Sequence, residues 1–252
     1  MSLSVALLTY NSEKRLKEVL ESVKDIADEI VALDSGSTDK TLEILNAYGV
    51  KVYRREFDNF VNQKNHLLSL TTKEWVLFLD DDEVLTPELA RSIEAELKSP
   101  RFDGYYLNRL TNYLGRWIRH AWYPDWQLRL ARRVKCRWVG SEVHESLKVE
   151  GRLGYLKGEL LHYSYSSISE HLSKIDRYST LYARGALKRG KRFSLLKLLT
   201  SPAGAFLRRY LLKRGFLDGF EGFVLSVMAS YYTFLKYLKI WELEKGESSN
   251  RP

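Results

Sequence analysis

The decisive stretch of this sequence is Trp75-Val76-Leu77-Phe78-Leu79, followed directly by Asp80-Asp81-Asp82-Glu83. Five apolar residues in a row are typical of a strand buried on both faces, as in a parallel sheet. The four carboxylates come where that strand should end, and ligands of open α/β sheets bind at the carboxyl ends of strands. Acids this close repel one another unless a cation or hydrogen-bond donors offset their charge. A hard divalent cation would do so; the alternative is a solvated turn whose acids cap the next helix.

Alternating strand and helix patterns surround this stretch. Strands are expected at 4–8, 30–33, 50–53 and 75–79. A helix is expected after each of them: the first is lined by Leu16, Val19, Leu20 and Val23, the second by Leu42 and Leu45, and the third covers 60–70. The fourth helix is capped by Thr86 and has Pro87 in its first turn. Repeated β-α units of this length predict a parallel sheet covered by helices. Asp34, at the end of the second strand, would then meet Asp80 to Asp82 along one edge of the sheet.

Three motifs in this order resemble glycosyltransferase family 2: Thr9-Tyr10-Asn11, Asp34-Ser35-Gly36-Ser37-Thr38-Asp39-Lys40-Thr41 and Phe78-Leu79-Asp80-Asp81-Asp82-Glu83. Later segments resemble the branch of that family that contains lipopolysaccharide-core β-glucosyltransferases: residues 123–130, 143–145 and 210–219. The resemblance extends from Leu3 to about Lys239. It implies the GT-A fold, a Rossmann-like α/β architecture with a mostly parallel sheet flanked by helices.

The resemblance also implies a nucleotide-sugar donor, in the first place a UDP-hexose. Asp34 would contact the uracil or the ribose, with Thr9, Tyr10 and Asn11 nearby. These four residues are therefore the expected nucleotide-binding residues outside the acidic run.

Within the acidic run, Asp80 and Asp82 occupy the two acidic positions of the D-x-D motif of the family. The resemblance implies that Asp82 binds Mg²⁺ or Mn²⁺ and that Asp80 lies toward the ribose and the waters of the metal. Asp81 lies between them and adds a further acid to the donor site. The chemistry agrees, because sugar transfer expels a nucleoside diphosphate and a divalent cation on its phosphates acts as a Lewis acid. The chain has no glycine-rich phosphate loop, so the metal and basic side chains are expected to hold the diphosphate.

The acceptor hydroxyl needs a general base, and a carboxylate is the usual one for inverting transfer. The candidates are Asp125, at the entrance of an expected strand, and Glu145, after the turn-like residues 139–141. Many relatives have a Glu-Asp pair at the start of a helix for this role, and this chain has none. His144 is either a further metal ligand or a half-buried histidine bonded to the backbone. His162 and His171 are interpreted as structural.

The composition suits a cytoplasmic α/β protein with an appendage. At 252 residues, 44% of them hydrophobic, the chain can bury a full α/β core. Cys136 is its single cysteine, so no internal disulfide forms, which is consistent with a reducing compartment. The first strand begins at the N-terminus, which predicts that no signal peptide precedes it. We expect a GT-A nucleotide-sugar-binding and catalytic domain at 1–165 and a basic helical region at 166–252.

Net charge is concentrated in the last third of the chain. Residues 166–252 carry 16 Lys and Arg against 7 Asp and Glu, whereas the first 165 residues carry 24 against 25. Basic residues alternate there with Leu, Phe and Tyr in expected helices at 168–187, 195–209 and 220–244, a pattern that suits an anionic membrane surface. The uncharged stretch 222–235 is too short to span a membrane. A solvated face is the alternative; nucleic acid is not expected, because no binding motif for it is present.

Three functions compete at this stage. The first is an inverting hexosyltransferase, peripheral on the cytoplasmic face of the cell membrane, with a lipopolysaccharide-core or other lipid-linked acceptor. The second is a metal-dependent phosphotransferase, which the acidic run fits poorly because no nucleophilic Asp followed by Thr or Val is present. The third is a non-catalytic module that binds nucleotide-sugar or membrane.

Overall fold

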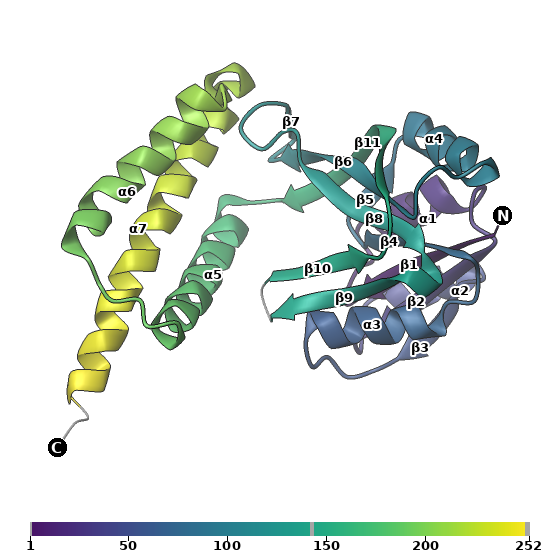
Figure 1. Cartoon of the computed structure of the whole chain (residues 1–252), viewed down its shortest axis with the longest axis horizontal. Helices are drawn as coiled ribbons and strands as arrows, with labels where there is room; N and C mark the ends of the chain where they lie inside the picture. Colours follow the sequence, from purple (N-terminus) through teal and green to yellow (C-terminus); the bar gives the residue numbers. More distant parts are fainter. Residues whose placement is uncertain (1, 142–143, 250–252) are drawn as a thin grey trace. The chain divides into compact units, whose positions relative to one another are not determined.

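The computed structural model describes residues 2–141 and 144–249 and divides the chain into two compact units (Figure 1). The first unit comprises Met1–Leu110 and Pro124–Tyr163. The second comprises Thr111–Tyr123 and Ser164–Pro252. Each unit is described by itself below.

A mixed sheet forms the centre of the first unit, with strand order β3-β2-β1-β4-β8-β6-β11-β5. The four strands that come first in the chain are parallel to one another, and β8 pairs with β4 in antiparallel direction. The strands are β1 (Leu3–Thr9), β2 (Glu29–Asp34), β3 (Lys51–Arg54), β4 (Trp75–Asp80), β5 (Glu83–Leu85), β6 (Gly104–Tyr113), β8 (Trp126–Arg132) and β11 (Leu153–Tyr165). The structure confirms the parallel half of the sheet that the alternating strand and helix pattern predicts.

Four helices flank the parallel half: α1 (Leu16–Val23), α2 (Thr41–Ala47), α3 (Phe60–Leu70) and α4 (Pro87–Lys98). The caps form as expected in α4, where Thr86 Oγ1 accepts a hydrogen bond from Leu89 N and Pro87 occupies the first turn. In α3 the cap is Asn59, whose side chain accepts from Asn62 N. Each cap satisfies one of the backbone donors that a helix start leaves unpaired.

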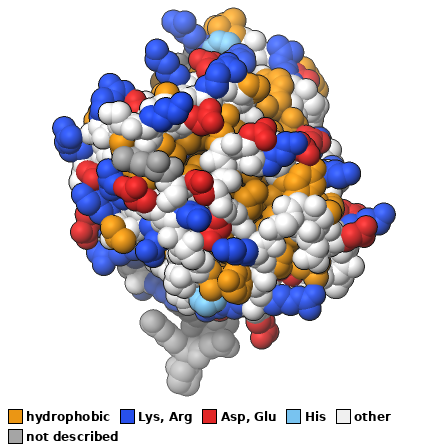
Figure 2. Space-filling view, turned by 90° about the vertical axis from the view of Figure 1, so that its right-hand side faces the viewer, with side chains coloured by type: hydrophobic (Ala, Val, Ile, Leu, Met, Phe, Trp, Pro, Cys, Tyr) orange, Lys and Arg blue, Asp and Glu red, His pale blue; other side chains and the backbone are white. Residues whose placement is uncertain are grey.

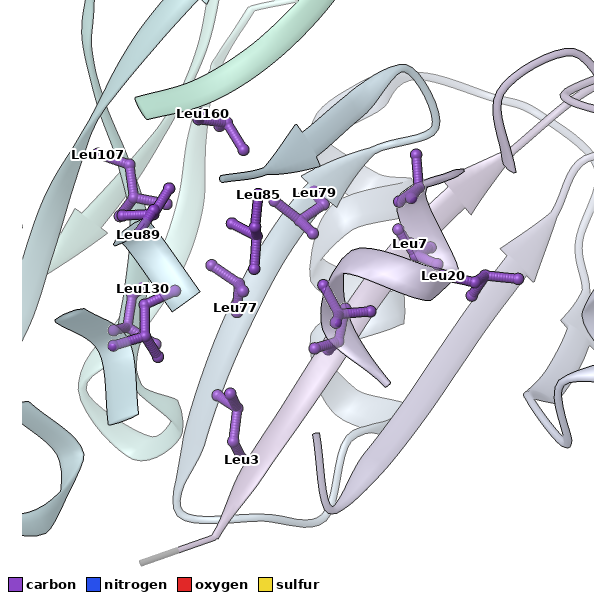
Figure 3. Close-up of a cluster of buried hydrophobic side chains, with 14 of the residues drawn as sticks. Leu3, Leu7, Leu20, Leu77, Leu79, Leu85, Leu89, Leu107, Leu130 and Leu160 are labelled. Carbon is purple, nitrogen blue, oxygen red and sulfur yellow. The ribbon is translucent and has the colours of Figure 1, made fainter. Parts of the chain in front are cut away.

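The five apolar residues of β4 are all buried, as expected for a strand covered on both faces. On one face, Leu77 and Leu79 join a leucine-rich cluster under α1 and α4 (Figure 3). On the other face, Val76 and Phe78 pack with Trp138 and with Leu67 of α3. Burial on this scale fixes the direction of β4 and therefore the place where its acidic end emerges.

A two-stranded hairpin, β9 (Cys136–Ser141) and β10 (His144–Val149), follows β8 through a short 3₁₀ turn at Arg133–Lys135. The prediction of a turn at residues 139–141 is wrong, because these residues form the end of β9. Gly140 misled the prediction: it lies inside the strand with a φ of +130°, a conformation that glycine adopts without strain.

The second unit is mainly helical: α5 (Ile168–Lys188), α6 (Leu195–Leu207), a π-helical turn (Arg208–Leu212), a 3₁₀ turn (Gly215–Asp218) and α7 (Gly219–Ser249), with the short strand β7 (Arg116–Ile118) beside β6. The three helices begin and end near the expected bounds, and α7 packs against both α5 and α6. Asp218 ties the unit together, because its buried carboxylate accepts hydrogen bonds from the backbone N–H groups of Arg119, His120 and Ala121 at 2.7–3.1 Å.

Apolar side chains remain exposed on this second unit. The most exposed are Leu195, Leu196, Leu199, Leu212 and Phe220. Within the described residues, no helix is both long enough and apolar enough to cross a membrane. Acidic, basic and hydrophobic side chains are interspersed on the face of the molecule shown in Figure 2.

The carboxylate of Glu29 holds the amino ends of three neighbouring segments together. Its two oxygens accept hydrogen bonds from Ser4 Oγ (2.7 Å), Lys51 Nζ (2.8 Å), Thr72 N (2.9 Å) and Thr72 Oγ1 (2.8 Å). Burial by itself would raise the pKa of Glu29, but the bonds from Lys51, Ser4 and Thr72 outweigh it and lower the pKa to about 2. The folded state therefore favours the charged form.

We expect Glu29→Gln to destabilise the protein by about 3 kcal/mol at pH 7. Because the pKa is lower in the folded state than in the unfolded chain, this stabilisation is complete above about pH 4.5 and is lost as the pH falls toward 2. Urea unfolding of both proteins between pH 7 and pH 2.5 measures the difference. The exposed Glu94→Gln variant is the control, with a change below about 0.5 kcal/mol. A Glu29→Gln effect that stays constant over this pH range would contradict the prediction.

Candidate active site

The carboxyl ends of the parallel strands bring the sequence-predicted residues together. In the register of the sheet, Thr9 is opposite Asp34 and Leu8 is opposite Asp80. The acidic ends of β2 and β4 therefore lie on either side of the end of β1. This is the edge at which ligands of open α/β sheets bind.

Asp34 organises the loop that follows β2. Its carboxylate is fully buried and accepts hydrogen bonds from Gly36 N (3.0 Å), from Ser37 N (2.9 Å) and Oγ (2.5 Å), and from Thr9 Oγ1 (3.1 Å). Gly36 has a φ of +97°, which glycine permits and which turns the chain back onto the carboxylate. Contact of Asp34 with a nucleotide remains a prediction.

The loop after β1 joins the loop after β2. Asn11 adopts a φ of +52°, its backbone N–H donates to Ser37 Oγ at 2.9 Å, and its side-chain oxygen accepts from Thr38 N at 2.9 Å. Tyr10, the preceding residue, is 62% exposed. The two loops thus present an exposed aromatic ring at the edge of the sheet.

The protein itself neutralises two of the four consecutive acids. Arg129 of β8 donates from Nη2 to Asp80 at 2.7 Å and to Glu83 at 2.8 Å, and Arg109 reaches Glu83 at 3.3 Å. Glu83 is fully buried. Burial alone would raise the pKa of Asp80, but Arg129 and then Lys64 outweigh it, so that this pKa lies well below its usual range. The sequence analysis did not find these cations.

Asp81 faces the loop after β1. Ser12 Oγ donates to its carboxylate, and burial raises the pKa of Asp81 to about 6, an effect that this hydrogen bond opposes and the charge of Asp80 reinforces. The acid between the two D-x-D positions is therefore held by the protein and is partly protonated near neutral pH.

Asp82 meets a histidine that the sequence analysis had interpreted as structural. Its Oδ2 lies 3.6 Å from Nε2 of His162 on β11, and the backbone oxygen of Asp82 accepts from Tyr163 N at 3.1 Å. Burial, followed by the charge of Arg109, lowers the pKa of His162 to about 3. The imidazole is consequently neutral at physiological pH, which is the form that binds metal ions.

Both base candidates are linked to this acidic cluster, in different ways. Asp125 is engaged through both oxygens, one by Arg109 at 2.8 Å and the other by Gln127 Nε2 at 2.6 Å. Glu145 lies on β10, and its Oε1 is 3.3 Å from Lys64 Nζ. Among the described residues, this is the one polar contact of the Glu145 carboxylate.

Lys64 connects Glu145 to the acidic end of β4. Its buried ammonium lies 3.5 Å from Asp80 Oδ1 and 4.4 Å from the ring centre of Trp138. One cation on α3 therefore brings a candidate base and the first acid of the D-x-D motif to the same place.

The donor set fits a hard divalent cation that is shared with a substrate. Among the side chains that the structure describes, which do not include that of His144, no three from His, Cys, Asp or Glu converge on a common point. Asp82 and His162 offer one carboxylate and one neutral imidazole, and Mg²⁺ typically takes one or two protein ligands and completes its shell with phosphates and water. The side chain of His144, the other predicted ligand, lies outside what the structure describes.

Comparisons with known proteins bear on the family to which the chain belongs. The model of glycosyl transferase family 2 matches residues 4–143. A lipopolysaccharide core biosynthesis glycosyltransferase of Rhizobium meliloti, LpsC, is 30% identical over 96% of this chain and 93% of its own length. The chain belongs to glycosyl transferase family 2.

Two further proteins extend the comparison. An uncharacterized glycosyltransferase of Rickettsia typhi is 32% identical over 96% of this chain and 87% of its own length. The crystal structure of S. aureus TarS 1-349 in complex with UDP aligns with a TM-score of 0.53 and 17% identity, over 100% of this chain and 92% of that one. The mixed sheet with flanking helices is thus the expected GT-A architecture. Family membership assigns glycosyl transfer and removes the phosphotransferase and binding-module alternatives.

Proposed function

We propose that this glycosyltransferase transfers a hexose, with inversion, from a UDP-hexose to a lipopolysaccharide-core or other lipid-linked glycan. The observation that carries the proposal is the acidic end of β4, where Asp80 and Glu83 are neutralised by Arg129 while Asp82 meets the neutral His162. The likeness of the whole chain to LpsC supports a core-type acceptor. The fold shared with UDP-bound TarS supports a uridine nucleotide.

On this proposal the exposed ring of Tyr10 and the interlocked loops around Asp34 and Asn11 form the nucleoside site. Asp82 and His162 would hold Mg²⁺ or Mn²⁺, which would supply positive charge to the departing diphosphate. Asp80 remains ionised beside Arg129 and faces the ribose. Asp81 supports the loop of Tyr10 through Ser12.

The acceptor oxygen attacks the anomeric carbon of the donor and loses its proton to a carboxylate of the protein. The bond from that carbon to the diphosphate oxygen breaks, and the electron pair leaves with UDP. We assign the base to Glu145, because its carboxylate contacts Lys64 alone among the described polar groups, whereas Asp125 is held through both oxygens. A base must have an oxygen available to the acceptor.

Asp82→Ala should abolish metal-dependent binding of UDP and sugar transfer while leaving the fold intact. The physical reason is that the half-buried carboxylate of Asp82 lies beside the neutral imidazole of His162, whereas that of Asp80 is neutralised inside the fold by Arg129. Calorimetric titration with UDP, with Mn²⁺ and with EDTA, measures the binding, and thermal unfolding checks the fold. His162→Ala should weaken Mn²⁺-dependent UDP binding in the same assay. Full turnover of Asp82→Ala in EDTA would contradict the metal role.

Glu145→Gln should lower the transfer rate by several orders of magnitude, since it removes the proton acceptor, while UDP-hexose still binds. Asp125→Asn is the matched variant and should retain more activity, because Asp125 is engaged by Arg109 and Gln127. Transfer rates and donor affinity of both variants decide between them. The opposite ranking would assign the base to Asp125, and activity within tenfold of wild type in both would exclude the two residues.

The second unit supports a peripheral location on the cytoplasmic face of the cell membrane. Leu196 and Leu199 of α6 are 71% and 67% exposed, and basic residues accompany them at Lys197, Lys213 and Arg214. Apolar side chains among basic ones suit the interface of an anionic bilayer, where each basic residue contributes about 1 kcal/mol before screening by salt.

The protein should therefore co-sediment with phosphatidylglycerol vesicles, and more strongly at low salt than at high salt. Leu196→Glu combined with Leu199→Glu should abolish sedimentation, because it removes apolar contact and adds negative charge. Val134→Glu, at an exposed apolar position of the first unit, is the control and should bind as wild type does. Equal sedimentation with neutral and anionic vesicles, or none with either, would contradict the prediction and favour the alternative that these helices present a solvated face.

A further inference from the structure

A pocket of about 410 Å³ lies in the first unit between the hairpin β9–β10 and the strands β6, β8 and β11. Its lining includes Tyr106 and Leu128 on the sheet side and Leu147 and Val149 on the hairpin side. Volumes of this size accommodate small organic ligands. None of the nucleotide-binding, metal-binding or base residues assigned above lines this pocket.

Three aromatic rings continue the sheet wall of this pocket. Tyr106, Trp126 and Tyr155 come from the neighbouring strands β6, β8 and β11. The ring of Tyr155 stacks on that of Tyr106 at 5.1 Å between centroids and meets Trp126 edge-on at 4.9 Å. Tyr155 is 63% exposed and Trp126 is 40% exposed. We name these three residues the aromatic platform.

Leaving the apolar surface of this aromatic platform in contact with water is energetically unfavourable, although cross-strand aromatic pairs also stabilise sheets. The flat ring faces suit the apolar C–H faces of sugars, because the ring quadrupole attracts weakly positive hydrogens. An open row of aromatic side chains next to a pocket is therefore more easily explained by a saccharide ligand than by sheet stability alone.

Basic residues dominate the rim. Arg137 and Lys148 are cross-strand partners in the hairpin, both exposed and both part of the lining. Lys135 also lines the pocket but is paired with Asp103 at 2.8 Å. Glu150 is the one acid in the lining. The two hairpin cations thus favour an anionic group, such as a phosphate or a carboxylate, on the bound molecule.

Strand β10 links the pocket to the reaction centre. Side chains alternate along a strand, so Glu145, Leu147 and Val149 belong to one face of the hairpin, whereas Lys148 and its cross-strand partner Arg137 belong to the other face and border the pocket from there. Glu145 contacts Lys64 beside Asp80, whereas Leu147 and Val149 line the pocket. Four residues of strand extend roughly 13 Å, a reach that suits a short oligosaccharide whose terminal hydroxyl lies at the base.

We infer that the pocket and the aromatic platform form a subsite for an anionic acceptor oligosaccharide, in which the sugar rings stack on Tyr106, Tyr155 and Trp126 and an acidic substituent pairs with Arg137 and Lys148. This inference rests on the proposed transfer to a core-type acceptor. It adds the part of the acceptor that the enzyme recognises away from the reacting hydroxyl.

The test uses the full-length protein and a deacylated, phosphorylated lipopolysaccharide-core oligosaccharide, with its dephosphorylated form as the second probe. Tyr155→Ala should raise the KM for the phosphorylated oligosaccharide about tenfold, equivalent to 1.4 kcal/mol. Tyr155→Phe keeps the ring and should stay close to wild type. Hydrolysis of UDP-hexose without acceptor, and the thermal unfolding midpoint, should not change in either variant.

The charge is tested separately. Arg137→Glu combined with Lys148→Glu should remove the preference for the phosphorylated over the dephosphorylated oligosaccharide, while Arg137→Lys combined with Lys148→Arg should retain it. Lys17→Glu, on the exposed side of α1, is the matched control for added negative charge and should leave the preference unchanged.

The outcomes separate this inference from the proposed function. If wild type transfers the sugar and Tyr155→Ala has an unchanged KM, the subsite alone is overturned. The same holds if Tyr155→Ala loses transfer and donor hydrolysis in parallel. Binding of the oligosaccharide by wild type without transfer, seen by saturation-transfer NMR and lost in Tyr155→Ala, would support the subsite and contradict the proposed transfer. Absence of both binding and transfer would overturn both.

Discussion

The interaction on which the site depends is the buried guanidinium of Arg129 between Asp80 and Glu83. Burying one carboxylate without a partner costs several kcal/mol, and two neighbouring ones cost more. Because β8 delivers Arg129 to the end of β4, the sheet can expose an acidic edge without destabilising itself. The antiparallel half of the sheet therefore contributes directly to the proposed donor site.

The four consecutive acids consequently have four different environments. Asp80 stays ionised beside Arg129. Asp81 is hydrogen-bonded to Ser12, and burial raises its pKa to about 6. Glu83 is fully buried. Asp82 meets an imidazole that burial keeps neutral. One short run of acids thus provides groups that stabilise the fold and the group proposed to bind the metal, and the difference between them comes from the strands that pack against the run.

The sequence was sufficient to predict the parallel half of the fold because its signals are local. The apolar run before Asp80 and the helix over Phe60–Leu70 need no distant partner to be recognised. The hairpin was missed at Gly140, where a glycine inside a strand resembles a turn. Arg129, Lys64 and His162 could not be assigned, since their roles arise from contacts across 16 to 81 positions of the chain, which no local sequence pattern predicts. Asp34 was placed at this edge by the strand pattern and the motif around Asn11 by family resemblance, and the structure adds that both stabilise their own loops.

The course of the chain has a further consequence for how the protein can be divided. Residues 111–123 belong to the helical unit but precede residues 124–163 of the first unit, so that each unit is assembled from two separate pieces of chain. A protein truncated after residue 165 would retain Tyr113 and Ile118 without the helices that bury them, and the N–H groups of residues 119–121 would lose the Asp218 carboxylate. Neither unit corresponds to a contiguous genetic module. Exchange of the helical unit between relatives by a single crossover would break this interleaving, whereas a double crossover that moves residues 111–123 together with the C-terminal segment would preserve it.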